Sequence, residues 1–124
     1  MDRASLDVPA LLRILGDTAP GIFVFAPDPD PAAGRAYSRM FAPHRAGVPE
    51  DPATGSASGP LGAYLVRHRL VKERSDIRIV SEQGTKMGRQ SFVHIALRVT
   101  EGRIGDIRVG GGVVLVLEGR LTLP

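Results

Sequence analysis

The sequence EDPATGSASG at residues 50–59 determines how the rest of this chain is interpreted. Its small and polar residues run directly into the most convincing helix of the chain, which we predict from Pro60 to about Arg69. Because proline is unfavourable inside a helix, we expect the helix to begin only a residue or two before Pro60. Residues 54–58 would then form its lead-in or its first turn.

The polar residues before this helix suggest a binding site for an anion. Asp51 and Thr54 are residue types that cap helix N-termini, and Gly55 lets a ligand approach the main chain closely. No glutamate or glutamine stands three residues after Thr54 or Ser56, so no capping box occupies the first amides. These amides, with the helix dipole behind them, could hold a carboxylate or a phosphate. An ordinary capped helix start is the alternative interpretation.

The remaining chain is typical of β-strands arranged around a buried helix. The predicted central helix is apolar on every side, and Gly59 and Gly62 reduce its girth so that neighbours can approach closely. A first helix is expected at residues 8–15, ended by Gly16. Period-two alternation is clearest at residues 92–99, and no strand–helix–strand repeat indicates a parallel sheet. We expect strands at residues 22–26, 36–41, 77–81, 91–100, 104–109, 113–117 and 121–123.

These patterns predict an α+β fold, in which a mostly antiparallel sheet wraps around one central buried helix in a single domain, residues 1–124. Apolar runs such as residues 113–117 are much shorter than the ~20 residues of a membrane-spanning helix. The absence of cysteine and of an export signal is typical of a cytoplasmic protein. A net charge of +3 does not indicate nucleic-acid binding. We interpret the basic cluster as a solvated helix end: Arg67, His68, Arg69, Lys72 and Arg74.

Four short blocks make the chain resemble the PhzF family of phenazine-biosynthesis-like isomerases, which share the fold of diaminopimelate epimerase. The blocks are RMFAP at 39–43, EDPATGSA at 50–57, QG at 83–84 with MGR at 87–89 and Ser91, and VGG at 109–111. The resemblance implies two similar lobes that face each other across a cleft, with these blocks in the C-terminal lobe. It also implies that the catalytic glutamate, which moves the proton, belongs to the N-terminal lobe. We therefore expect this chain to correspond to half of such an enzyme.

The resemblance implies roles for four residues of the central stretch. The aspartate that matches Asp51 contacts the substrate, and the serine that matches Ser56 lines the same pocket. We therefore assign catalytic roles to Asp51 and Ser56 and substrate binding to Thr54, Gly55 and Ser56. The implied substrate is a small carboxylated metabolite, with no cofactor. Gln90 stands where the family usually has proline, and no role is assigned to its neighbours Arg89 and Ser91.

The chemistry of these residues limits what the chain can do alone. A carboxylate beside a helix N-terminus is held ionised, so Asp51 is a poor base for removing a proton from carbon. Glu50 is a second candidate base, but adjacent side chains of an extended segment point to opposite sides, which favours a structural role. Ser56 lacks the Gly-x-Ser-x-Gly spacing of a serine hydrolase. The scattered histidines give no metal-ligand spacing, and no metal is expected: His44, His68 and His94.

Two hypotheses of different classes follow. The first is a C-terminal lobe of a PhzF-like isomerase that shares its cleft with an N-terminal lobe, and that is inactive without it. A second copy of the chain is the alternative partner, because a lobe that packs against a similar lobe should expose an apolar face. The second hypothesis is a non-catalytic module that binds a small anion or a protein partner.

Overall fold

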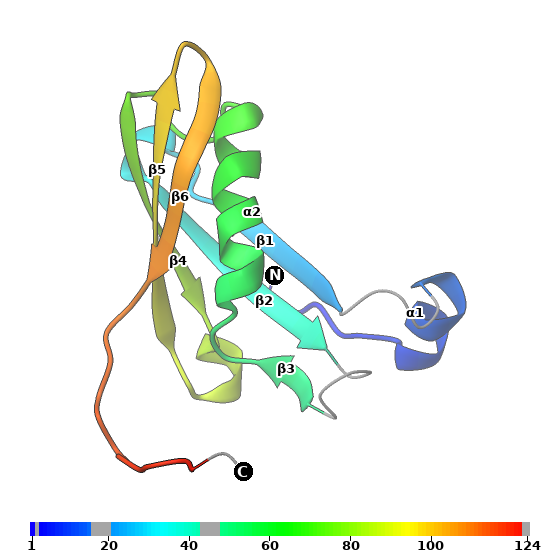
Figure 1. The fold of residues 1–124 in the computed structure, drawn as a ribbon. Helices are drawn as coiled ribbons and strands as arrows, with labels where there is room; N and C mark the ends of the chain where they lie inside the picture. Colours follow the sequence, from blue (N-terminus) through cyan, green and yellow to red (C-terminus); the bar gives the residue numbers. More distant parts are fainter. Residues whose placement is uncertain (2, 16–20, 43–47, 123–124) are drawn as a thin grey trace.

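The computed structural model describes residues 1, 3–15, 21–42 and 48–122 (Figure 1). Two α-helices and six strands make up most of this part of the chain, with two short 3-10 helices, η1 and η2. In chain order the elements are α1 (Val8–Leu15), β1 (Ile22–Pro27), η1 (Pro31–Ala33), β2 (Arg35–Ala42), β3 (Val48–Asp51), α2 (Gly55–Arg67), β4 (Asp76–Gln83), η2 (Thr85–Met87), β5 (Ser91–Thr100) and β6 (Arg103–Gly110).

The six strands form one sheet in the order β1-β2-β4-β5-β6, and β3 pairs with β2. All of these pairs are antiparallel except β2–β4, which is parallel. The predicted mostly antiparallel sheet is therefore confirmed, with one addition. The chain passes from β2 to β4 through β3 and α2, because parallel neighbours require a long crossover connection. This crossover delivers residues 50–59 to one end of the sheet.

The hairpin turns follow from local sequence. Glu101 and Gly102 both adopt left-handed conformations, with φ of 51° and 73°, which makes the β5–β6 connection a two-residue turn of the kind that matches strand twist. In the β1–β2 connection, Asp30 Oδ1 accepts a hydrogen bond from Ala32 N at 2.9 Å and begins η1. Gly34 then adopts the left-handed conformation that returns the chain to β2.

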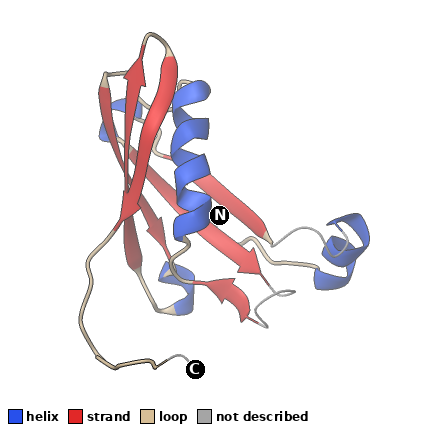
Figure 2. Cartoon of the chain, in the orientation of Figure 1, coloured by secondary structure: helices blue, strands red, loops and turns tan. Residues whose placement is uncertain are grey.

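The twisted sheet packs against one side of α2, and the core lies between them (Figure 2). Leu61 and Leu65 are buried against inward-facing side chains of β4 and β5, among them Ile79 and Ile95. The predicted central helix is therefore confirmed, but the sheet covers it from one side. Its opposite face is exposed at Pro60, Tyr64 and Arg67.

The prediction of where α2 begins was wrong. The helix starts at Gly55, five residues before Pro60, and ends at Arg67 rather than at about Arg69. Pro60 lacks an amide hydrogen and cannot donate to the carbonyl of Ser56, but only this one bond is lost and the proline ring lies on the exposed face. Packing of the buried face against the sheet is strong enough to carry the helix through the proline.

The predicted strands at residues 113–117 and 121–123 do not form in the described part of the chain. The last strand, β6, ends at Gly110, and residues 111–122 leave the sheet without regular structure (Figure 1). The apolar side chains at 113–117 are between 79% and 91% exposed. An apolar sequence favours an extended conformation, but a strand exists only where another strand accepts its hydrogen bonds. Leu123 lies outside the described residues.

The first helix has the predicted bounds. Asp7 Oδ1 accepts a hydrogen bond from Ala10 N at 2.9 Å and caps α1. The expected stop at Gly16 lies outside the described residues. Pro43 and Gly47, before β3, also lie outside them. No helix in the described part of the chain is long and apolar enough to cross a membrane.

Two glycines of α2 provide a matched test of how closely the helix approaches the sheet. A Cβ atom at Gly62 would lie 2.6 Å from Cγ2 of Ile95, whereas one at Gly59 would lie in ordinary contact, 3.6 Å from Cγ2 of Val109. Both alanine substitutions raise helix propensity by about 1 kcal/mol. Gly62→Ala alone adds an overpacking cost of roughly 1–3 kcal/mol, so it should be the less stable variant in urea unfolding. Equal stabilities for the two variants would contradict this packing.

Candidate functional site

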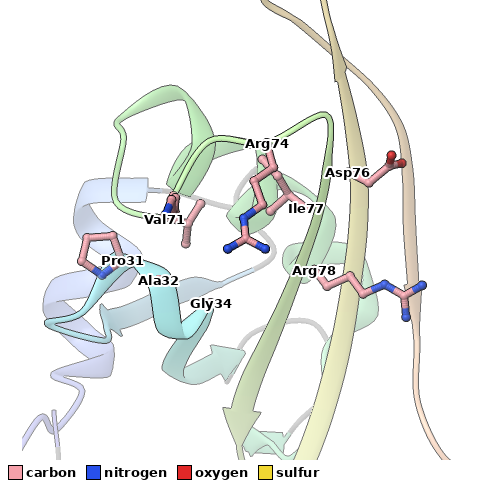
Figure 3. A pocket seen from close by; sticks show the side chains of 9 residues that line it. Pro31, Ala32, Gly34, Val71, Arg74, Asp76, Ile77 and Arg78 are labelled. Atoms are coloured by element: carbon pink, nitrogen blue, oxygen red, sulfur yellow. The ribbon is translucent and has the colours of Figure 1, made fainter.

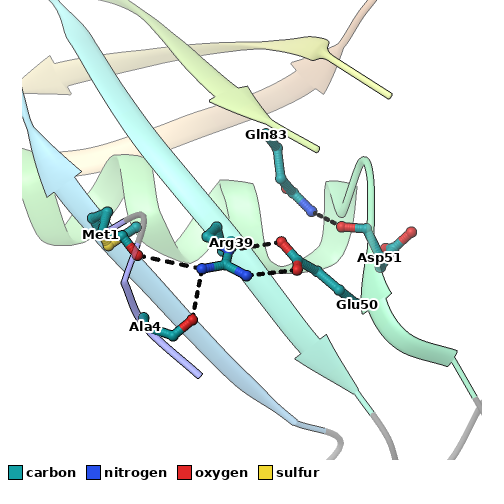
Figure 4. Close-up of polar contacts among 6 residues, drawn as sticks. All are labelled: Met1, Ala4, Arg39, Glu50, Asp51 and Gln83. Carbon is teal, nitrogen blue, oxygen red and sulfur yellow. Dashed lines mark hydrogen bonds and ion pairs between the residues drawn. The ribbon is translucent and has the colours of Figure 1, made fainter. Parts of the chain in front are cut away.

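A buried glutamine positions the chain before α2. Gln83, at the end of β4, is fully buried, and its Nε2 donates to the carbonyl of Asp51 at 2.6 Å and to Oγ1 of Thr54 at 2.9 Å. Its Oε1 accepts a hydrogen bond from Thr54 N at 3.1 Å. Figure 4 shows the side chain reaching from β4 to the loop. One amide group therefore holds the segment from Asp51 to Thr54 against the sheet.

Sequence reasoning did not identify this role of Gln83, although a signal was available. Alternate residues of β4 face the core, and the set Ile77, Ile79, Ser81 and Gln83 is buried. A glutamine that continues a buried row must find hydrogen-bond partners, because an unpaired buried amide is costly.

Thr54 occupies the N-cap position of α2, but its side chain does not cap the helix. Its hydroxyl donates instead to Oδ2 of Asp51 at 2.6 Å. The first turn contains no acidic residue, and Gly55 and Ser56 are exposed. With no side-chain cap from Thr54, the first amides of the helix are open to an anion. The structure brings Asp51, Thr54, Gly55 and Ser56 together at this helix start.

The side chains of Glu50 and its neighbour Asp51 contact different parts of the molecule. Both of its carboxylate oxygens accept hydrogen bonds from Arg39, at 2.9 and 2.8 Å, and the side chains of this ion pair are only 9% and 13% exposed for Arg39 and Glu50. Arg39 also donates to the carbonyls of Ala4 and Met1, which ties the N-terminal segment to β2 and β3 (Figure 4). This bidentate contact supports the structural interpretation of Glu50.

A cavity of about 590 Å³ opens beside the start of α2. Gly55 lines it from the helix, and the opposite walls come from β5 and from the end of β6. The main lining residues on those walls are Gln90, Ser91, Phe92, His94, Val109 and Gly111. Ser91 and Gln90, to which sequence analysis assigned no role, therefore lie next to the helix start. The cavity therefore joins the start of α2 to the first residues of β5 and the last residues of β6.

The loop between β4 and β5 packs against the stretch before α2, and its Gln90 lines the cavity. Gly84 has a φ of 78°, and a Cβ atom there would lie 2.9 Å from the carbonyl oxygen of Pro52, so the loop packs closely against the central stretch.

Thr85 Oγ1 and Gln90 Nε2 both donate to Oε1 of Glu82, and these bonds lower the pKa of Glu82 from its ordinary value. Their contribution to stability is present at neutral pH and is lost as the pH falls through that lowered pKa.

Comparison with known proteins identifies the family of this chain. The family model described as phenazine biosynthesis-like protein matches residues 5–119. The chain belongs to this family. Its relatives include an uncharacterized isomerase from Clostridium acetobutylicum, 38% identical over 104 residues that cover 83% of this chain and 34% of the relative. They also include the trans-2,3-dihydro-3-hydroxyanthranilate isomerase of Pseudomonas aeruginosa, 41% identical over 92 residues that cover 73% of this chain and 32% of that enzyme.

A solved PhzF structure supports the same assignment of fold. The crystal structure of the phenazine biosynthesis protein of the PhzF family from Bacillus anthracis aligns with a TM-score of 0.53 and 26% identity, over 61% of this chain and 26% of that protein. The predicted fold, one lobe of the PhzF type, is therefore confirmed. The chain spans about one third of the length of the curated relatives named above.

Replacement of the buried glutamine tests the network that holds the site. Gln83→Leu leaves the Thr54 amide and the Asp51 carbonyl without their buried partner, at a cost of roughly 1–3 kcal/mol for each unsatisfied group. Gln90→Ala, which removes only an exposed hydrogen bond, should change stability by less than about 0.5 kcal/mol. Urea unfolding compares the two variants. A loss in Gln83→Leu as small as that in Gln90→Ala would contradict the role of Gln83.

Proposed function

We propose that this PhzF-family chain forms the C-terminal lobe of an isomerase and contributes Asp51, Thr54, Gly55 and Ser56 to a cleft where a small carboxylated metabolite undergoes proton transfer. The observation that carries the proposal is the helix start of α2, whose amides have no side-chain cap although Thr54 stands at the N-cap. The family match suggests the type of reaction at this uncapped helix start, because relatives are named as isomerases.

Each residue of the helix start has a distinct proposed task. The amides of Gly55 and Ser56 bind the substrate carboxylate, because charge-assisted hydrogen bonds and the helix dipole both favour an anion there. Thr54 holds the Asp51 carboxylate through a 2.6 Å hydrogen bond, so that Asp51 can accept a hydrogen bond from a polar substrate group. Ser56 is exposed in the same first turn, and its hydroxyl is the further proposed contact to the substrate.

The proposed reaction also requires a proton acceptor, which we propose comes from a second lobe. Isomerisation by proton transfer requires a group that takes a proton from carbon and returns it. Glu50 is held on both oxygens by Arg39, and the Asp51 carboxylate is held by the Thr54 hydroxyl, so neither is placed as a free base. We therefore propose that the lone chain binds small carboxylates weakly but does not turn over substrate.

The exposed apolar surface supports a partner lobe. Ile107 and Val109 are partly exposed beside the first turns of α2, and residues 113–117 add five exposed apolar side chains whose backbone has no strand partner in the described part of the chain. Patches of this kind mark contact sites in soluble proteins. The proposed occupant is an N-terminal lobe, with a second copy of this chain as a substitute when that lobe is missing.

Deuterium uptake from solvent into a candidate substrate tests the catalytic proposal. The lone chain should catalyse no uptake, and mixing it with a separately expressed N-terminal lobe of a close relative should restore exchange. Asp51→Asn should weaken the restored activity by about tenfold or more, the loss expected for one hydrogen bond to a charged group.

The matched control is Glu50→Gln, which keeps the size of the side chain. It should destabilise the fold by weakening the Arg39 contact but should not remove exchange from the folded, mixed protein. Exchange by the lone chain that survives Asp51→Asn and disappears in Glu50→Gln would make Glu50 the base and overturn the proposal. Carboxylate binding without exchange in any mixture would favour the non-catalytic module.

Light scattering at micromolar concentration tests the proposed partner surface. The chain should self-associate, because the exposed residues 113–117 and the apolar surface at Ile107 and Val109 favour burial. Val114→Lys with Val116→Lys places two charges in this segment and should shift the chain towards monomer, whereas Arg67→Ala with Arg103→Ala should not. A strictly monomeric chain would count against the second copy as partner.

A further inference from the structure

A second crevice lies away from the helix start, where η1, the loop after α2 and the first residues of β4 meet (Figure 3). Its volume is about 290 Å³, and it shares no lining residue with the cavity beside Gly55. The buried side chains of Val71 and Ile77 contribute to its walls. Neither the family match nor the proposed function uses it.

Two backbone hydrogen bonds fix the walls of this crevice. Lys72 N donates to the carbonyl of Pro31 at 2.9 Å, and Val80 N donates to the carbonyl of Gly34 at 2.9 Å. Backbone groups two residues apart on a strand point to the same side, so the amide of Arg78 faces β2 as the amide of Val80 does. The pairing of β2 with β4 covers only residues 80–82 of β4, so it does not include Arg78. The crevice is therefore a preformed space with an additional backbone donor at its edge.

The charge of the crevice is positive. Lys72 and Arg74 line it, and neither forms an ion pair or side-chain hydrogen bond with any residue that the structure describes. Figure 3 shows the Arg74 guanidinium reaching towards Gly34 and Ala32, whereas Asp76 and Arg78 point to the other side of β4. Asp76, the acidic residue among those lining the crevice, is bound to Arg98 at 3.2 Å.

We infer that this crevice binds the phosphate group of a small phosphorylated ligand through Lys72 and Arg74. A planar guanidinium and a mobile ammonium on one wall suit the several oxygens of a phosphate, which carries close to two negative charges at neutral pH. The volume exceeds that of a single phosphate group, which leaves space for the body of a small molecule against Val71 and Ile77. The basic cluster after α2 is thereby divided: Arg67 and His68 remain at the helix end, while Lys72 and Arg74 serve this site.

Titration of the isotope-labelled chain with inorganic phosphate, followed by amide NMR shifts at roughly 0.15 M ionic strength, tests the inference. Saturable shifts should appear at residues 71–78 and 32–34, and Lys72→Ala with Arg74→Ala should weaken binding at least about tenfold, as expected for lost charge-assisted contacts. Arg67→Ala with Arg103→Ala removes the same charge elsewhere and should leave the affinity unchanged.

Three results would overturn the inference. The first is an equal loss of affinity in both double variants, which indicates non-specific attraction. The second is shifts confined to residues 55–57, which place phosphate at the helix start instead. The third is tighter binding of a short single-stranded nucleic acid than of phosphate through the same two residues, which makes the crevice part of a polyanion surface.

Discussion

The buried amide of Gln83 is the interaction on which the site depends. A threonine hydroxyl has one hydrogen to donate, and because Thr54 Oγ1 accepts from Gln83 Nε2, its own hydrogen is directed to Asp51. Gln83, which is fully buried, thus sets the direction of both hydrogen bonds that connect β4 to the Asp51 carboxylate through Thr54. The same arrangement occupies the Thr54 hydroxyl and leaves the first amides of α2 open.

Two adjacent acidic residues serve different parts of the molecule because they lie on a strand. Side chains of β3 alternate, so Glu50 turns towards Arg39 while Asp51 turns towards Thr54. The Arg39–Glu50 ion pair is nearly buried, and removing one partner would leave an uncompensated charge. It also links β2 and β3 to the N-terminal segment through the carbonyls of Ala4 and Met1. The carboxylate that pairs with Arg39 and the carboxylate at the start of α2 are therefore separated by the geometry of one strand.

The sheet covers α2 from one side and leaves the opposite face and the segment after β6 exposed. Five apolar side chains at 113–117, each at least 79% exposed, are far from what the hydrophobic effect favours for a lone chain. The chain also spans about one third of the curated relatives it matches. In the proposed function, this exposed apolar surface is where a second lobe packs.

The sequence alone predicted the α+β class, the central buried helix, and the grouping of Asp51, Thr54, Gly55 and Ser56, because periodicity and short motifs report local structure. Tertiary structure decided where α2 begins, since packing overrides the local cost of Pro60. It also decided that residues 113–117 form no strand in the described chain, and that Gln83 and Arg39 direct Asp51 and Glu50 apart. These outcomes depend on partners distant in sequence, which local patterns do not specify.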